Sequence, residues 1–316
     1  MPAMSSTACG KLILLGEHAV VYHSPAIAIP LSSLRVRTTV EAAIGQPQGR
    51  LQIKAGQLGI DHDLEMLGME HFLVQTLELL FTYLGVKQRP TCLVTITADL
   101  PLSAGLGSSA AIVISLLRAM SAFLGHPLEL HDLNELAFQS EKAVHGRPSG
   151  IDNTVITYEK PVYYQRGEEP EFLQPSHGYA FVVADTGIRK STGGSVAQLA
   201  ADLAANPTAI QPHLDAIADL VREGKRSFQT GDLAALGEAM NADQDHLSAL
   251  RLSCPELDAL VLAARQAGAL GAKLTGGGMG GHVLALVTPE TETKVSQALL
   301  SAGSPRVFTT HLKPAE

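Results

Sequence analysis

Apolar and polar positions along the chain follow two periodicities. Short apolar or alternating runs predict strands, and apolar residues spaced three or four apart predict helices. The first 60 residues are rich in strand patterns, whereas residues 191–267 are helical and alanine-rich, with several breaks. The other predicted helices are 65–84, 112–124, 132–144 and 290–301, and the predicted strands are 12–15, 26–29, 34–40, 91–97, 154–158, 162–164, 179–184, 270–274, 282–287 and 306–311.

The order of these elements shows no steady alternation of strand and helix. A doubly wound parallel sheet requires that alternation, so the pattern predicts an α+β fold. The polar stretch 167–178 contains two prolines and is the best candidate for a linker. We therefore predict an N-terminal domain over residues 1–170 and a C-terminal domain over residues 171–316.

The composition is that of an ordered globular protein. The chain has 316 residues, 46% of them apolar and 17% charged, which is enough for two domains with developed cores. A net charge of −8 predicts neither nucleic acid nor an anionic membrane as a partner. The three cysteines are scattered and suggest no disulfide framework, and we find no signal peptide or membrane-spanning run. We expect a cytoplasmic protein, whose alanine-rich helices could pack internally or across a homodimer.

A glycine-rich segment carries the strongest chemical signal. Residues 101–111 read Pro-Leu-Ser-Ala-Gly-Leu-Gly-Ser-Ser-Ala-Ala and join a predicted strand to a predicted helix. Small residues let backbone N–H groups approach a ligand, and a helix N-terminus favours an anion. The hydroxyls of Ser108 and Ser109 could reach a phosphate or a cation. A flexible turn with a serine N-cap is the alternative interpretation.

A second glycine-rich segment, residues 273–281, reads Lys-Leu-Thr-Gly-Gly-Gly-Met-Gly-Gly. So much glycine costs backbone entropy, and a simple hairpin would not need it. Both glycine segments fit a loose dinucleotide-binding pattern. The second opens a strand, however, and the first is not followed by an acidic residue at the end of a second parallel strand. Close contact between backbone and another kind of ligand is therefore the better interpretation.

Three further segments contribute polar side chains. Lys11 lies beside a short apolar strand, with Glu17 and His18 after it. Glu141 and His145 are spaced i, i+4 on one helical face, as a metal-ligand pair or an ordinary surface pair would be. Asp152 follows a Pro-Ser-Gly turn and precedes an expected strand, where an aspartate is most often a cap or turn former.

Together these residues suit phosphoryl transfer, which needs bound phosphates, Mg²⁺, a cation and a carboxylate near the attacking hydroxyl. One alternative is a metal-dependent hydrolase that uses Glu141, His145 and His18. It would need a third fixed ligand and leaves two glycine segments unexplained. Another alternative is a non-catalytic ATP-binding module, although such a module would not need Lys11 and Asp152.

The ordered motifs resemble those of the GHMP kinases over nearly the whole chain. They are Lys11-x-x-Leu14-x-Gly16-Glu17-His18-x-Val20, the 101–111 segment, His145-Gly-x-Pro-Ser-Gly-x-Asp152-Asn153 and the 273–281 segment. Within that superfamily they are most similar to mevalonate kinases, because galactokinases typically have an Asp-Tyr pair after Gly-Glu-His. The nearest alternative is a GHMP kinase that acts on a sugar or on phosphomevalonate.

This resemblance implies a two-domain α+β fold with the active site in the cleft between the domains. It also implies transfer of the γ-phosphoryl group of ATP to the 5-hydroxyl of mevalonate, a step of isoprenoid biosynthesis, with Mg²⁺. Asp152 would accept or orient the hydroxyl proton. Lys11 would lower the pKa of that hydroxyl and keep Asp152 ionised, because a nearby opposite charge favours the charged form. Ser109 and Glu141 would hold Mg²⁺.

The resemblance also implies the binding residues. ATP would contact Pro101, Ala104, Gly105, Leu106, Gly107, Ser108, Ser109, Ala110 and Ala111. The acceptor would contact Glu17, His18, Thr192, Gly277 and Gly278. Two departures stand in the second glycine segment: Gly277 replaces an alanine that is usual in the family, and Met279 interrupts the glycines. The side chain of Met279 puts close approach of that backbone to a ligand in question.

Overall fold

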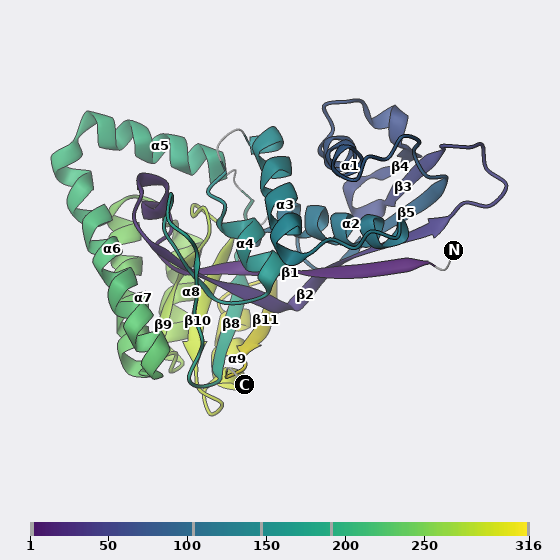
Figure 1. The fold of residues 1–316 in the computed structure, drawn as a ribbon. Helices are drawn as coiled ribbons and strands as arrows, with labels where there is room; N and C mark the ends of the chain where they lie inside the picture. Colours follow the sequence, from purple (N-terminus) through teal and green to yellow (C-terminus); the bar gives the residue numbers. More distant parts are fainter. Residues whose placement is uncertain (1–2, 103–104, 146–147, 190–191, 315–316) are drawn as a thin grey trace. The chain divides into compact units, whose positions relative to one another are not determined.

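The computed structural model describes residues 3–102, 105–145, 148–189 and 192–314 (Figure 1). Helices and strands are mixed without regular alternation, as the α+β prediction requires. Two compact units are present, and both are discontinuous along the chain. The first comprises Met1–Gly10, Leu34–Leu102 and Gly107–Glu159, and the second comprises Lys11–Ser33, Ser103–Leu106 and Lys160–Glu316. The predicted boundary at residue 170 divides the chain into consecutive domains, and it stays a prediction.

Strands β1 (Met4–Leu15) and β2 (Ala26–Ala42) contribute residues to both units. Strands 12–15, 26–29 and 34–40 were predicted within them, and the last two form one continuous strand. In the first unit, β2 pairs with β5 (Cys92–Ala98) antiparallel. The same unit contains β3 (Leu51–Ala55), which pairs with β5 parallel, and β4 (Ile60–Asp63), which pairs with β3 antiparallel.

Four helices of the first unit pack against one another (Figure 1). They are α1 (Phe72–Tyr83), α2 (Ser108–Phe123), α3 (Leu130–His145) and α4 (Ile151–Tyr158). The helix predicted over 65–84 is wrong in its first part. A 3-10 turn over Leu64–Leu67 comes first, and Gly68 with a φ of 77° ends it before α1 begins.

The strand predicted over residues 154–158 is wrong, because this segment is the end of α4. Its β-branched residues favour a strand by propensity. Gly150, in a left-handed conformation, nevertheless starts a helix, and the Thr154 hydroxyl donates to the Gly150 carbonyl at 2.8 Å. Packing of α4 on α2 and α3 buries Ile151, Val155 and Ile156 and outweighs the local preference.

The second unit contains a four-stranded antiparallel sheet in the order β11-β8-β10-β9. These strands are β8 (Tyr179–Asp185), β9 (Gly271–Thr275), β10 (His282–Val287) and β11 (Arg306–Leu312), which confirms the four strands predicted there. In this unit β6 (Val162–Tyr164) pairs with β2 and with β7 (Glu171–Phe172), and the latter lies inside the predicted linker.

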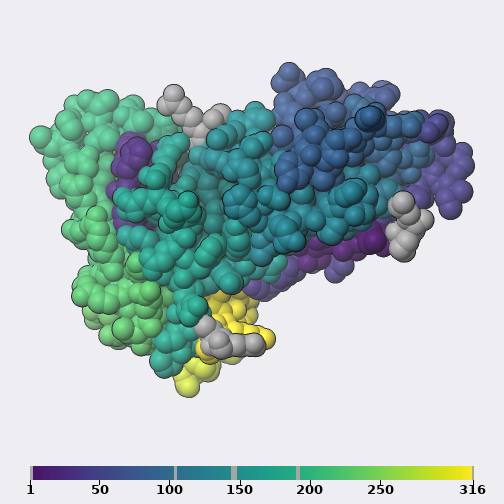
Figure 2. Space-filling model, in the orientation of Figure 1, coloured from purple at the N-terminus to yellow at the C-terminus, as the bar shows by residue number. Residues whose placement is uncertain are grey.

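Helices α5 to α9 complete the second unit. They are α5 (Thr192–Ala205), α6 (Pro207–Thr230), α7 (Leu233–Ala249), α8 (Pro255–Gln266) and α9 (Glu292–Ser301), in agreement with the helical pattern. Helices α7 and α8 pack on β9, and α9 packs on β8 and β11. Side chains of α5 and α6 are exposed, in green, on the face drawn in Figure 2. Among the residues described, no helix is long and apolar enough to span a membrane.

Glycines bring α7 close to β9. A Cβ atom on Gly237 of α7 would lie 2.5 Å from the Leu270 carbonyl oxygen, and one on Gly271 would lie 2.4 Å from that of Gly237. A side chain at either position would force the two elements apart. Polar groups of α7 can therefore reach the edge strand β9.

Candidate functional site

Gly105 and Leu106 of the first glycine-rich segment lie beside the second glycine-rich segment in the second unit, although the two segments are far apart in the sequence. A Cβ atom on Gly276 would come within 3.3 Å of the Gly105 carbonyl oxygen. The N–H of Lys11, on β1, donates to the Leu106 carbonyl at 2.9 Å, and Lys11 is itself 7% exposed. The structure thus brings three of the sequence motifs together within one unit.

His18 adds the Gly-Glu-His motif to the same place. Its Nε2 lies 3.1 Å from the Gly277 carbonyl oxygen. A carbonyl oxygen can only accept, so the ring donates from Nε2, and a neutral ring then carries an acceptor at Nδ1. Burial lowers the pKa of His18 to about 4, although the Gly277 hydrogen bond opposes this shift. His18 Nδ1 is buried and has no hydrogen-bond partner among the residues described.

Glu17, directly before His18 in the sequence, belongs to a cluster of three buried charges that also includes Lys273, the first residue of the second glycine segment. The Lys273 ammonium donates to Glu17 Oε1, and its Nζ lies 3.4 Å from Asp243 Oδ2. The side chains of Lys273 and Asp243 are 0% exposed, and that of Glu17 is 1% exposed. Lys273 also donates to the Leu274 carbonyl at 2.8 Å. We call Glu17, Asp243 and Lys273 the buried charge cluster.

Burial governs the titration of this cluster. It raises the pKa of Glu17 to about 8, against the opposing effect of the Lys273 charge, and the nearby Asp243 raises it further. Burial also raises the pKa of Asp243, again against Lys273. Two carboxyl groups face one ammonium, so a single proton makes the cluster neutral.

Sequence reasoning missed Lys273 and Asp243 as functional candidates. Lys273 was noted only as the first residue of the glycine segment, and Asp243 lies in a helix with ordinary amphipathic spacing. No local signal marks the pair, because their burial depends on contact between α7, β9 and the turn after β1. The single sequence-level hint is a lysine inside an otherwise apolar strand pattern.

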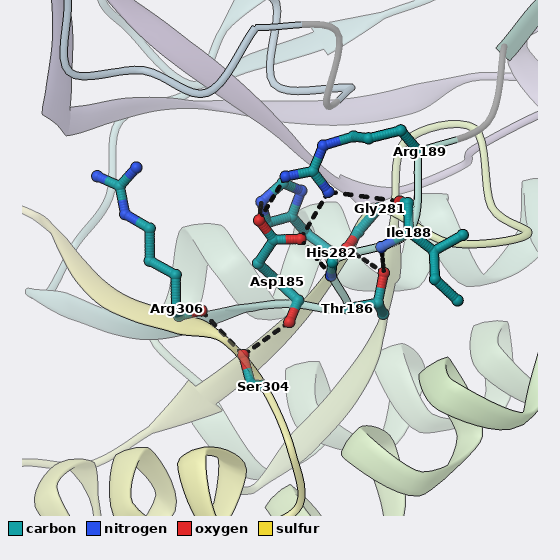
Figure 3. Close-up of polar contacts among 9 residues, drawn as sticks. Asp185, Thr186, Ile188, Arg189, Gly281, His282, Ser304 and Arg306 are labelled. Carbon is teal, nitrogen blue, oxygen red and sulfur yellow. Dashed lines mark hydrogen bonds and ion pairs between the residues drawn. The ribbon is translucent and has the colours of Figure 1, made fainter.

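The segment after β8 is tied to the end of the second glycine segment (Figure 3). Asp185 accepts two hydrogen bonds from the Arg189 guanidinium, at 2.7 and 2.6 Å, and one from the Gly187 N–H at 2.8 Å. Burial raises the pKa of Asp185, but the bonds from Arg189 and Gly187 outweigh it and leave that pKa lowered. The Thr186 hydroxyl and N–H both donate to the Gly281 carbonyl at 2.9 Å. This turn leads toward Thr192, which begins α5 but whose side chain lies outside the described part of the chain.

Met279, which interrupts the glycines of the second segment, lies with its backbone against Leu252 and borders a cavity. Its backbone is left-handed, with φ of 58°, and its N–H donates to the Leu252 carbonyl at 2.7 Å. The side chain lines a cavity of about 450 Å³. The other lining residues are Gly194, Ser195, Gln198, Leu199, Asp202, Leu250, Arg251 and Leu252. Gly278 packs closely as well, since a Cβ atom there would lie 2.3 Å from the Leu252 carbonyl oxygen.

The first unit holds the helix that the glycine-rich segment opens. Gly107 is the N-cap of α2, with a left-handed φ of 75°, and no side chain of the described residues is seen to cap this helix. Ser108 is buried and Ser109 is half-buried in the first turn. The first-turn N–H groups of an uncapped helix can bind a phosphate. The predicted contact Ala104 lies outside the described residues, whereas Pro101 is described and half-buried.

The two predicted carboxylates also lie in the first unit. Glu141 is on α3 and is 8% exposed, and Asp152 is in the first turn of α4. These helices pack on each other and on α2. An acidic residue in the first turn of a helix faces the positive end of its dipole. Across the described ranges, no three His, Cys, Asp or Glu residues gather as a metal site, and the side chain of His145 lies outside them.

Comparisons with known proteins agree with these motifs. The model of the GHMP kinases N terminal domain matches residues 71–160, and the GHMP kinases C terminal model matches residues 216–304. The mevalonate kinase of Aeropyrum pernix is 35% identical over 90% of this chain and 88% of its own length. The mevalonate kinase of Pyrococcus horikoshii is 35% identical over 94% of this chain and 92% of its own length.

Solved structures extend the similarity to the fold. The structure of L. major mevalonate kinase in complex with R-mevalonate has a TM-score of 0.84 and 28% identity, over 98% of this chain and 96% of that one. The Methanococcus jannaschii mevalonate kinase has a TM-score of 0.85 at 22% identity, over 100% of this chain and 99% of that one, and so shows the fold alone. The two family models and the relatives show that the chain belongs to the GHMP kinase family.

Proposed function

We propose that this protein transfers the γ-phosphoryl group of ATP to the 5-hydroxyl of mevalonate, within isoprenoid biosynthesis. The proposal rests on the contact of the His18 ring with the Gly277 carbonyl, close to where Gly276 packs on Gly105 and Lys11 bonds to Leu106. The contacts of His18, Lys11 and Gly105 with one another's segments in the second unit support a shared role of these motifs. Relatives with 35% identity over nearly the whole chain are mevalonate kinases, which supports this acceptor.

ATP is bound in this proposal by the 101–111 segment and the N-terminus of α2. The left-handed backbone of Gly105 and Gly107 turns the chain so that successive N–H groups can converge on phosphate oxygens. The positive end of the α2 dipole, at Ser108 and Ser109, favours the bound phosphates. Gly105, Leu106 and Gly107 to Ala111 supply backbone, and Pro101 and Ala104 flank them.

Ser109 and Glu141 suit Mg²⁺ by the chemistry of their donor atoms. A hydroxyl and a carboxylate are hard oxygen ligands, and they stand on α2 and α3, which pack on each other. Mg²⁺ keeps several waters and needs only one or two protein oxygens beside the phosphates, so a larger cluster is not required. When bound, the ion neutralises charge that develops on the transferred phosphoryl group.

Asp152 and Lys11 act on the attacking hydroxyl in this proposal. Asp152 accepts the hydroxyl proton or orients the hydroxyl, from the first turn of α4. Lys11 supplies a positive charge that lowers the pKa of that hydroxyl and stabilises the negative charge that develops on it. Its 7% exposure strengthens that electrostatic effect, because little water is present to screen it.

The acceptor is recognised in the second unit. His18 Nδ1 is a buried acceptor without a partner among the described residues, so a hydroxyl of mevalonate can donate to it. Glu17, Gly277, Gly278 and Thr192 complete the acceptor side in this proposal. The cavity next to Met279 supports it, because Gly194 lies near Thr192 in the chain and Met279 follows Gly278.

A coupled assay for ADP release tests the function. We expect turnover with mevalonate and none above background with phosphomevalonate, galactose or homoserine. Turnover of galactose or phosphomevalonate, together with no reaction of mevalonate, would contradict the proposal. A chelator should abolish the reaction, and added Mg²⁺ should restore it.

A further inference from the structure

We propose that Lys273 and Asp243 are positioning residues for the acceptor: the buried charge cluster fixes Glu17, and through Glu17 it fixes the orientation of His18. This inference rests on the proposed function only for the identity of the acceptor. Neither Lys273 nor Asp243 is assigned a role by the motifs.

The frame around Lys273 is already rigid without any charge. On α7, the side chain of Asn241 accepts from the Ala272 N–H at 3.0 Å, and that of Gln244 accepts from the Leu274 N–H at 2.7 Å. At the end of β9, Thr275 exchanges two 3.0 Å hydrogen bonds with the backbone of Ile13. These neutral bonds satisfy the edge strand β9 on both sides of Lys273 and hold it between α7 and β1.

Stabilisation of this strand does not explain the three buried charges, because neutral hydrogen bonds already hold the strand. Each buried ion costs several kcal/mol of desolvation, and apolar residues of similar size often stabilise a protein as well as a buried ion pair does. Buried charges are better explained by the geometry that they impose. Here the geometry is imposed on Glu17, because its Oε1 accepts from the Lys273 ammonium across 256 sequence positions.

The turn that carries Glu17 needs such an anchor. The next residue, His18, has a left-handed backbone with φ of 61°, which is unfavourable for a side chain with a Cβ atom. The Ala19 N–H bonds back to the Glu17 carbonyl, so the two residues form one tight turn. The ion pair with Lys273 fixes this strained turn at Glu17, and the hydrogen bond to the Gly277 carbonyl fixes the His18 ring.

Burial keeps His18 uncharged, and the cluster contributes only through the Lys273 charge. Burial is the main cause of its lowered pKa, and the Lys273 charge lowers it further. A neutral ring that donates from Nε2 must present Nδ1 as an acceptor. The groups that face His18 and the cluster are Glu17 on the turn, Asp243 on α7, Lys273 on β9 and the Gly277 carbonyl of the glycine segment. The orientation of His18 therefore depends on Lys273 through Glu17, whereas burial is the main reason that its ring stays neutral.

Steady-state kinetics of Lys273→Met test the inference. We expect the KM for mevalonate to rise at least about tenfold, because a displaced recognition group weakens acceptor binding, while the KM for ATP changes by less than about twofold. The surface variant Lys294→Met, on α9, is the matched control and should leave both constants unchanged. An unchanged KM for mevalonate in Lys273→Met, or an equal loss toward ATP, would overturn the inference.

A second variant keeps the test decisive if Lys273→Met does not fold. Lys273→Met combined with Asp243→Asn buries only one carboxyl group, which can become neutral by taking up a proton. It should fold and show the same selective rise in the KM for mevalonate. Asp243→Asn alone keeps the Glu17–Lys273 ion pair but removes the second carboxylate beside Lys273, so we expect a selective rise in the KM for mevalonate that is smaller than in Lys273→Met. Failure of the wild type to use mevalonate would instead contradict the proposed function, and the same comparison would then be made with the acceptor that it does use.

Discussion

In our proposal the N-terminus of α2 binds the phosphates and the buried charge cluster orients the acceptor site, and the two regions are built in opposite ways. The α2 site is local, because Gly107, Ser108 and Ser109 are consecutive and the helix that follows supplies the dipole. The cluster is non-local, because Glu17 and Lys273 are separated by 256 positions and Asp243 comes from a third element. A phosphate is an anion that backbone can bind wherever a helix begins. A hydroxylated acceptor needs side chains held in one orientation, and that orientation is set by burial.

The largest effect is expected in the first unit, at Asp152. Asp152→Asn should lower kcat by at least roughly 10²-fold, the scale of losing a general base, while ATP still binds. Single-turnover kinetics with titration of an ATP analogue measure both quantities. Asp132→Asn, in the first turn of α3, is the control and should retain its kcat. A near-normal kcat for Asp152→Asn would remove this residue from the reaction.

The second prediction sharpens the role of the first unit. Glu141→Gln should raise the Mg²⁺ concentration needed for half-maximal activity by about tenfold or more, because one anionic ligand is lost. The KM for mevalonate should stay the same, since Glu141 lies on α3 in the unit that binds the nucleotide in our proposal. Titration of activity with Mg²⁺ at saturating mevalonate measures the effect. An unchanged Mg²⁺ curve would show that Glu141 is not a ligand.

The third prediction tests the acceptor side at a single atom. His18→Gln keeps a side-chain N–H that can donate to the Gly277 carbonyl but loses the acceptor at Nδ1. The KM for mevalonate should rise about fivefold, as the loss of one neutral hydrogen bond predicts. His18→Asn places an amide oxygen near the Nδ1 position and should recover part of the loss. Equal effects of the two variants would show that Nδ1 is not the recognition atom.

The fourth prediction uses pH and has the smallest expected effect. Burial raises the pKa of Glu17 from an ordinary value of 4.5 to about 8. A carboxyl group with a raised folded-state pKa contributes stability that is complete below its unfolded value and is lost as the pH rises through the folded value. His18 has the opposite sign, because its pKa is lowered from 6.5 to about 4, so its contribution is lost only as the pH falls below 6.5. Between pH 6.5 and about 8.5 the Tm should therefore fall.

The neutral variant Asp243→Asn should flatten this fall. Removing the second carboxylate lowers the pKa of Glu17, because the remaining carboxylate and the Lys273 ammonium balance each other. Each kcal/mol of stability corresponds to roughly 2–4 °C in Tm for a chain of this order of size. Asp245→Asn, exposed on the same helix, is the control and should keep the wild-type slope. Identical slopes for Asp243→Asn and wild type would contradict the shared proton.

The same contrast explains what could be predicted from the sequence. The 101–111 segment and α2 could be predicted because glycine, serine and helical apolar spacing are adjacent in the chain. The strands β8 to β11 could be predicted because each is a short apolar run between turn residues. Helix α4 could not, because the β-branched residues of Ile151–Tyr158 favour a strand and only packing on α2 and α3 makes them helical. The roles of Lys273 and Asp243 could not be predicted, because nothing near them in the sequence indicates that α7 and β9 bury them together.

In our proposal this chain phosphorylates a primary hydroxyl of mevalonate. The most direct test is ³¹P NMR of the reaction product. The 5-carbon of mevalonate is a methylene group, whereas the 3-carbon bears no hydrogen. Phosphorylation at the 5-hydroxyl predicts a phosphomonoester signal that is split into a triplet by two methylene protons. A singlet, which the 3-hydroxyl would give, or the absence of any phosphomonoester from mevalonate while ATP is consumed, would contradict the account.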